Sequence, residues 1–246
     1  MLSIFNRKKY LIDLLEGFVD MHNHILPGID DGVKTVEESI ELVKAFADFG
    51  VQDFIATPHI MHNYYPNDSE TIGKSLAILQ NGLKMNDLKE VSIEAAAEHM
   101  IDANFETLLE NGDVMPMQKN YLLVEMSYLQ ASINFEEAIR KIAEKRFFPI
   151  LAHPERYVFF QNRMKKYKEL KDKGILFQLN MLSISEYYGK EVQQTAIKLL
   201  EEGLINFIAT DVHNMSQLNS IKQIKLSKKL LNTLERLVET TTYNFG

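Results

Sequence analysis

Short apolar runs alternate with longer segments of helical periodicity along the chain, and this alternation constrains the fold more than any other feature. The first apolar run, 18–21, is followed by a predicted helix over 35–49, after which Gly50 is a natural helix C-cap. A predicted strand over 51–56 follows directly. Alternating strand–helix units build a parallel sheet, and one long series of them can close into a barrel.

The alternation continues towards the C-terminal end without a linker rich in proline, glycine or serine. The expected strands cover 18–21, 51–56, 91–98, 121–126, 147–152, 175–180 and 204–209. The expected helices cover 35–49, 69–83, 104–109, 134–145, 162–173, 190–202 and 221–240. Together these segments make seven strand–helix units.

Two architectures compete for such a series. An open doubly wound sheet normally carries a glycine-rich phosphate loop after its first strand, and the chain has neither GxGxxG nor GxxxxGK[ST]. The regular barrel has one unit more than this chain. We therefore predict an α/β fold, a distorted TIM-like (β/α)7 barrel that forms a single domain over 18–246. A short N-terminal arm or helix is expected over 1–17.

Composition excludes several kinds of site and partner. The chain has no cysteine, which rules out disulfides, cysteine-ligated zinc, iron–sulfur clusters and a thiol nucleophile. A formal net charge of −7 argues against general binding to nucleic acid or anionic lipid. No run approaches the ~20 apolar residues of a membrane span, and the opening segment lacks a signal-peptide cleavage site. We expect a cytoplasmic protein with no nucleic-acid partner and no membrane insertion.

Six of the seven predicted strands carry a histidine or a carboxylate at or near their C-terminal end. These ends converge on one mouth in a parallel barrel, and active sites form there. The exception is the sixth strand, which ends in Asn180. The converging residues are His22, His24, His59, Glu98, Glu125, His153, Asp211 and His213.

These eight side chains are of the types that bind metal ions. His22 and His24 share one face of their strand, because side chains alternate with a period of two. Each residue alone could be a hydrogen-bonded structural side chain, but Glu125 lies among apolar residues where an unpaired carboxylate is costly. One ion uses about three to five ligands, so the set indicates two or three ions with a bridging carboxylate. Such ligands suit manganese, iron or zinc, and such a site suits phosphoester hydrolysis.

Two further positions could take part in catalysis. Arg156 follows the fifth strand closely and could contact phosphate oxygens, although a salt bridge with Glu155 is the alternative. Asp30 and Asp31 lie in the loop above the first strand, and one of them could orient water or protonate the leaving oxygen. Their alternative role is a turn or a helix cap before Thr35.

Two histidines are left outside this set. His99 follows Glu98 directly and should point to the opposite face of the strand, so we expect it to be structural. His62 lies in a polar loop after the second strand, where a solvated side chain is the better expectation.

A resemblance to the polymerase-and-histidinol-phosphatase (PHP) superfamily is carried by VDMHNHILPGIDDGVKTVEES, IATPHI, AAEH, YLLVEMS, LAHPERY and IATDVHN. These segments are most similar to its bacterial tyrosine-protein phosphatase branch, which is associated with capsule and exopolysaccharide synthesis. The resemblance runs from Phe18 to Asn214 and implies a seven-stranded distorted barrel, a usually manganese-dependent site and hydrolysis of phosphotyrosine. It implies the same eight ligands, with Glu98 bridging, and supports functional roles for Arg156 and Asp31.

The chain departs from this branch after its last strand. Relatives often carry an arginine shortly after the final DxH motif, as a second phosphate contact, whereas 214–220 contains no basic residue. The difference bears on substrate affinity and substrate identity. The stretch Asn63–Tyr65 could compensate by stacking on a phosphotyrosine ring.

Three hypotheses follow. The first is a metal-dependent phosphatase that hydrolyses phosphotyrosine, by metal-hydroxide attack, on a bacterial tyrosine kinase that regulates surface polysaccharide synthesis. The second keeps the site but replaces the substrate with a small phosphate ester such as histidinol phosphate. The third is a non-catalytic scaffold that keeps the barrel, against which the complete ligand set argues.

Overall fold

The computed structural model describes residues 10–246. The first part of the predicted arm, residues 1–9, lies outside the described residues. In the remainder of the arm, Leu11–Leu14 form one turn of 3-10 helix, η1, and Leu11 is fully buried.

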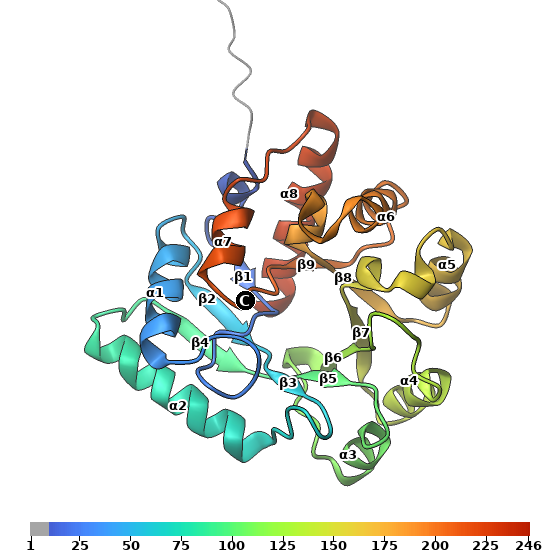
Figure 1. Ribbon diagram of the computed structural model, residues 1–246, viewed down its shortest axis with the longest axis horizontal. Helices are drawn as coiled ribbons and strands as arrows, with labels where there is room; N and C mark the ends of the chain where they lie inside the picture. The colour runs from blue at the N-terminus through green and yellow to red at the C-terminus, as the bar shows by residue number, and fades with distance from the viewer. Residues whose placement is uncertain (1–9) are drawn as a thin grey trace, which may run out of the picture.

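The described chain forms nine strands, and every pair of adjacent strands is parallel. One sheet has the order β1-β2-β4 and the other has the order β3-β5-β6-β7-β8-β9. Helices surround these strands on the outside (Figure 1). The strands are β1 Val19–Asp20, β2 Asp53–Ala56, β3 His59–Ile60, β4 Ser92–Ala95, β5 Glu98–Met100, β6 Tyr121–Glu125, β7 Phe148–Ala152, β8 Leu176–Asn180 and β9 Phe207–Ala209.

Nine strands arise from seven predicted units because the second and third units are each broken in the middle. The second unit breaks at Thr57-Pro58 into β2 and β3, and the third breaks at Ala96-Ala97 into β4 and β5. Proline has no N–H to donate to a strand ladder, which explains the first break. The breaks distort the barrel and place His59 and Glu98 at the beginning of new strands that lead into the mouth.

The barrel closes between its first and last strands. The N–H of Asp211 donates to the carbonyl of His22 at 2.8 Å, and the N–H of His24 donates to the carbonyl of Val212 at 3.0 Å. Below this seam the buried Asp20 carboxylate accepts the N–H of Thr210 at 3.0 Å and its hydroxyl at 2.5 Å. These bonds join the two sheets into the distorted barrel.

Eight helices cover the outside of the strands in residues 10–246. They are α1 Val36–Ala47, α2 Ser69–Met85, α3 Phe105–Asn111, α4 Phe135–Glu144, α5 Met164–Asp172, α6 Lys190–Glu201, α7 Met215–Ile221 and α8 Lys228–Phe245. Side-chain caps set several of their first residues, as where the Thr35 hydroxyl accepts the N–H of Glu38 at 3.3 Å. No helix among these residues is both long and apolar enough to cross a membrane.

The core has an outer part under the helices and an inner part within the barrel. Leu123 and Ile150 belong to the inner cluster, whereas Leu122 and Val124 belong to the outer one. This alternation is the one expected for strands that line a packed barrel. Phe245, at the end of α8, packs near Tyr121 and Phe207, which begin β6 and β9, and so fills the end opposite the mouth.

The prediction of a helix over 221–240 was wrong about where the helix begins, because α7 ends at Ile221 and α8 begins at Lys228. The structure has two helices there, because Asn214 caps α7 through the N–H of Gln217 at 3.1 Å and Ser227 caps α8 through the N–H of Leu230 at 3.4 Å. The Leu/Ile periodicity of the tail concealed this change of direction, which places α7 beside the mouth and α8 against β1 and β9 (Figure 1).

Candidate metal centre

All eight residues predicted as ligands lie together at the mouth of the barrel, six of them at or after the C-terminal end of a strand and two, His59 and Glu98, at the beginning of β3 and β5. Seven are buried, and only His213 is partly exposed. They come from six of the seven predicted strands, as expected for side chains that converge on a barrel mouth.

Glu98 stands at the middle of this cluster. Its Oε2 lies 3.3 Å from His22 Nε2, 3.5 Å from His24 Nε2 and 3.1 Å from His59 Nδ1. Its other oxygen, Oε1, lies 3.0 Å from His153 Nε2. One carboxylate therefore faces four imidazoles that come from three strand ends, an arrangement that fits a bridging ligand.

Asp211 and Glu125 complete the two sides of the cluster. Asp211 Oδ1 lies 3.4 Å from His22 Nε2 and 3.3 Å from His24 Nε2. On the opposite side, Glu125 Oε1 lies 3.0 Å from His59 Nδ1. Each side therefore combines imidazole with carboxylate, the donor set that suits divalent transition metals.

Four sets of these donor atoms are compact enough to hold an ion. In each, the potential ligand atoms lie within 4.8 Å of one another. The sets are His22, His24 and Asp211; His22, Glu98 and His153; His59, Glu98 and Glu125; and His24, Asp31, His59 and His213. Because the sets share members, they describe adjoining positions within one centre.

Asp31 lies at the outer edge of this centre. Its Oδ1 is 3.3 Å from His59 Nε2 and 3.4 Å from His213 Nε2. Burial by itself would raise the pKa of Asp31, but hydrogen bonds with the two imidazoles hold that pKa well below its usual value. This environment favours the ionised carboxylate and fits a cation-binding role.

Several potential metal-ligand atoms at the centre are buried without a hydrogen-bond partner among residues 10–246. They are His22 Nε2, His24 Nε2, His59 Nδ1 and Glu98 Oε2. Buried polar atoms in folded proteins nearly always have partners, so such a group needs an explanation. Four nitrogen and oxygen atoms that face one another without hydrogen-bond partners fit the binding of divalent cations.

Side chains behind the ligands fix their orientation. Gln178 Oε1 lies 2.9 Å from His22 Nδ1, and Asp30 Oδ2 lies 2.8 Å from His24 Nδ1, so the Nε2 atom of each ring is turned into the cluster. Asn180 Nδ2 donates to Asp211 Oδ2 at 2.7 Å.

The sixth predicted strand, β8, therefore contributes Gln178 and Asn180 as supports for the ligands. We did not predict this role from the sequence. The available signal was the pair of amides two residues apart in an otherwise apolar strand, which places both on one face.

The electrostatics of the centre are those of mutually balanced charges. Burial would raise the pKa of Glu98, but the adjacent His22 and His59 hold it well below its usual value. Burial would lower the pKa of His24, but Asp30 raises it well above the ordinary value. The carboxylates thus attract positive charge to the imidazoles, and protons compete there with metal cations.

Arg156 reaches the same centre from the turn that follows β7. Its Nη1 donates to Asp211 Oδ2 at 3.0 Å. Its guanidinium lies between two rings, 4.2 Å from the centroid of Tyr128 and 4.0 Å from that of Tyr188. The alternative salt bridge with Glu155 does not form, because Glu155 is buried and accepts the N–H of Asn180 at 3.0 Å.

A cavity of about 490 Å³ opens over these groups. Tyr65 lines it and stacks against His59, with 5.5 Å between the ring centroids. The stretch 214–220, which contains no arginine, contributes two amides to the cavity, Asn214 and Gln217. The cavity is lined by Asp31, His59, Met61, Tyr65, Met100, Glu125, Met126, Ser127, Tyr128, Arg156, Tyr188, His213, Asn214 and Gln217.

The remaining two histidines lie outside the cluster. His99 is fully buried, its Nδ1 is 3.1 Å from the carbonyl of Leu123, and its Nε2 accepts the N–H of Met115 at 3.1 Å. Burial lowers the pKa of His99 to about 4, which suits a neutral structural ring. His62 is exposed on its loop and does not line the cavity.

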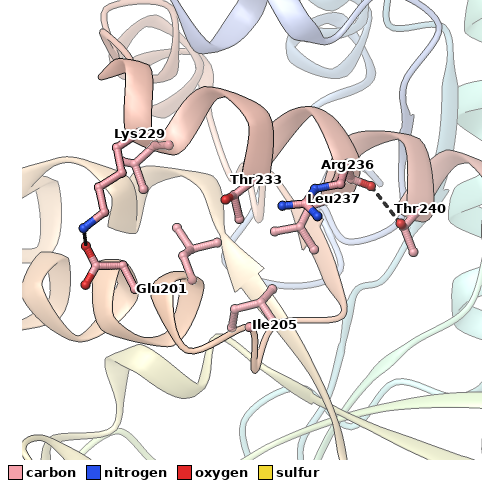
Figure 2. Close-up of a pocket in the computed structure, with 10 residues that line it drawn as sticks. Glu201, Ile205, Lys229, Thr233, Arg236, Leu237 and Thr240 are labelled. Atoms are coloured by element: carbon pink, nitrogen blue, oxygen red, sulfur yellow. Dashed lines mark hydrogen bonds and ion pairs between the residues drawn. The ribbon is translucent and has the colours of Figure 1, made fainter.

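A second cavity, of about 520 Å³, lies between α6 and α8 (Figure 2). Glu201 and Lys229 form an ion pair across it at 2.6 Å. The Thr240 hydroxyl donates to the carbonyl of Arg236 at 2.7 Å. This cavity holds no cluster of imidazoles or carboxylates within the described chain.

Comparison with known proteins identifies relatives over nearly the whole chain. Residues 18–233 match the family model "Capsular polysaccharide synthesis, CpsB/CapC". A "Putative tyrosine-protein phosphatase CapC" of Staphylococcus aureus is 29% identical over 221 residues, which are 89% of this chain and 86% of that protein. The tyrosine-protein phosphatase YwqE of Bacillus subtilis is 28% identical over 202 residues, which are 82% and 79% of the two chains.

A solved structure shares the fold. It is described as belonging to "YwqE from Bacillus subtilis and CpsB from Streptococcus pneumoniae, unique metal-dependent tyrosine phosphatases". The two chains superpose with a TM-score of 0.79 at 25% sequence identity, over 92% of this chain and 94% of the other.

Proposed function

The chain belongs to the CpsB/CapC family of capsular polysaccharide synthesis, and we propose that it acts there as a metal-dependent phosphatase on phosphotyrosine in a bacterial tyrosine kinase. The observation that carries this proposal is the position of Glu98, whose two oxygens face four imidazoles at the centre of the mouth. That arrangement suits a bridged group of cations.

The eight predicted ligands would hold two or three divalent ions, with manganese as the first choice and iron or zinc also compatible. When bound, such ions would activate water as a nucleophile near neutral pH and neutralise charge on the phosphoryl group. Asp31 would add a carboxylate at the outer edge, between His59 and His213. Gln178 and Asp30 keep the rings of His22 and His24 turned inwards.

Arg156 would bind the non-bridging phosphate oxygens. Its guanidinium is held in place by Tyr128 and Tyr188, so little side-chain freedom is lost when a substrate binds. One of its nitrogens already contacts Asp211, which keeps the group beside the ligands. Tyr65, at the other side of the cavity, offers an aromatic surface to the phenyl ring of the substrate.

An assay with a phosphotyrosine peptide and a panel of metals tests this function. We expect hydrolysis with added manganese and its loss on chelation. Turnover that persists with chelator would contradict a metal-dependent mechanism. Faster hydrolysis of histidinol phosphate than of the peptide would support the small-ester alternative. Purified protein that contains no metal, and stays inactive after manganese is added, would support the scaffold alternative.

A further inference from the structure

A smaller cavity of about 340 Å³ adjoins the cavity over the metal centre. The two share the residues Tyr128, Arg156 and Tyr188, so the guanidinium and its two rings form the wall between them. A group bound to Arg156 from the metal side therefore lies directly beside the smaller cavity. We call this smaller cavity the side pocket; it is completed by Val158, Gln161, Glu191 and Val192.

The walls of the side pocket suit an apolar side chain. Val158 is 52% exposed although it lines a cavity, and the two tyrosine rings border it, whereas Val192 is buried beneath the pocket. The N–H of Val158 donates to the carbonyl of Tyr128 at 3.0 Å, which holds the two loops together at the pocket. The pocket is therefore formed before a ligand binds, and burial of its apolar surface by a ligand would contribute favourable free energy.

Charge at the side pocket discriminates against acidic groups. Among the described residues, Arg156 is the one cation in its wall, and it is already paired with Asp211. Glu191 lies at the first turn of α6 and lines the pocket with a negative charge. An acidic side chain would meet Glu191, whereas an apolar one would cover Val158 and the rings.

We propose that the side pocket binds an apolar side chain next to the phosphotyrosine in the polypeptide substrate. The inference rests on the proposed function, in which Arg156 holds the phosphate. The tyrosyl side chain separates the phosphate from the backbone, so the backbone lies towards the opening of the cavity. The neighbouring residues are only about 3.8 Å further along at their Cα atoms, and a long apolar side chain from one of them can extend past Tyr128 and Tyr188 into the pocket. The pocket thereby makes the enzyme selective for the residues around the phosphotyrosine.

The test compares two phosphotyrosine peptides, one with leucine and one with serine on both sides of the phosphotyrosine, and free phosphotyrosine. For the manganese-loaded wild-type enzyme we expect kcat/KM to be about tenfold higher for the leucine peptide. Val158→Asp should remove this preference through KM and leave turnover of free phosphotyrosine within about twofold. Ile78→Asp is the matched control, because Ile78 is 53% exposed on α2 and lines neither cavity.

A second variant, Val158→Trp, fills the pocket without adding charge and should also remove the preference. Equal kcat/KM for both peptides in the wild-type enzyme, or a preference that survives both substitutions, would overturn the inference while leaving the phosphatase activity in place. Absence of turnover on all three substrates would instead overturn the proposed function, and the inference with it.

Discussion

The cavity at the barrel mouth and the cavity between α6 and α8 are nearly equal in size, at about 490 and 520 Å³, but differ in chemistry. At the mouth, buried carboxylates and imidazoles converge and leave potential ligand atoms without hydrogen-bond partners in the described part of the chain. Between the helices, Lys229 and Glu201 are exposed by 74% and 39% and neutralise each other (Figure 2). Buried polar groups that converge mark a cavity as a candidate functional site, whereas the volume of the cavity does not.

The origin of this difference is topological. Residues at the mouth come from the C-terminal ends of parallel strands, which all point to one place. The other cavity forms where two outer helices meet, and its polar residues come from solvent-facing positions.

The largest expected effect is that of removing the central carboxylate. Glu98→Gln should lower kcat on a phosphotyrosine peptide by about a thousandfold or more, because the neutral amide cannot bridge cations between four imidazoles. Glu201→Gln, which removes the carboxylate of the other cavity, should leave kcat unchanged. The measurement is kcat of both variants, with circular dichroism as a check of folding. Equal losses of kcat in both variants would contradict a special role for the carboxylate at the mouth.

A smaller effect is expected from replacing Arg156 at the mouth, with Arg236 in the other cavity as the control. Arg156→Lys should lower kcat/KM by about a hundredfold, since a lysine cannot bind phosphate in two-point fashion or fill the space between Tyr128 and Tyr188. Arg236→Lys, in the cavity between α6 and α8, should change it by less than about twofold. Steady-state kinetics on the same peptide provide the measurement. An unaffected Arg156→Lys enzyme would remove this residue from the phosphate site.

Gln178→Leu should weaken manganese binding by about tenfold, because His22 loses the partner that orients its ring. Titration calorimetry or metal-dependent activity measures the shift. Gln193→Leu is the control, since the Gln193 amide donates to the carbonyl of Ile184 on the outer side of the barrel. Unchanged metal affinity in Gln178→Leu would mean that the ring is held by other groups.

The smallest effect concerns pH, in a part of the barrel remote from the mouth. Burial lowers the pKa of Lys171 to about 8, against an ordinary value of 10.5. Between these values the folded protein has released the proton that the unfolded chain still binds, so stability should rise as pH increases from about 8 towards 10.5. Urea unfolding at several pH values would measure this contribution. A Lys171→Met protein with the same pH slope would show that other groups cause it.

The convergence of the eight predicted residues was foreseeable because each one is marked by its place in the chain. A histidine or carboxylate that follows an apolar run is visible in the sequence, and parallel topology brings such positions together. Pro58 could have signalled the break between β2 and β3, and Asn214 the beginning of α7. Both are local signals in the sequence.

The supporting contacts were not predictable in this way. That Gln178 would face His22, or that Arg156 would pair with Asp211 instead of its neighbour Glu155, depends on side chains far apart in the chain. The same applies to the rings of Tyr128 and Tyr188, which come from loops after β6 and β8. Propensity and periodicity describe neighbours in sequence and contain no information on such pairs.

The sequence by itself determined the class of this protein: alternating strand and helix units, no cysteine for a thiol nucleophile, and histidines and carboxylates at the strand ends. The tertiary structure decided how those residues act together. It made Glu98 the common partner of four imidazoles and turned Asp31 towards His59 and His213. The physical reason is that hydrophobic periodicity specifies which face of each element is buried, whereas ligand geometry is fixed by strand register and barrel closure, which exist only when the whole chain is folded.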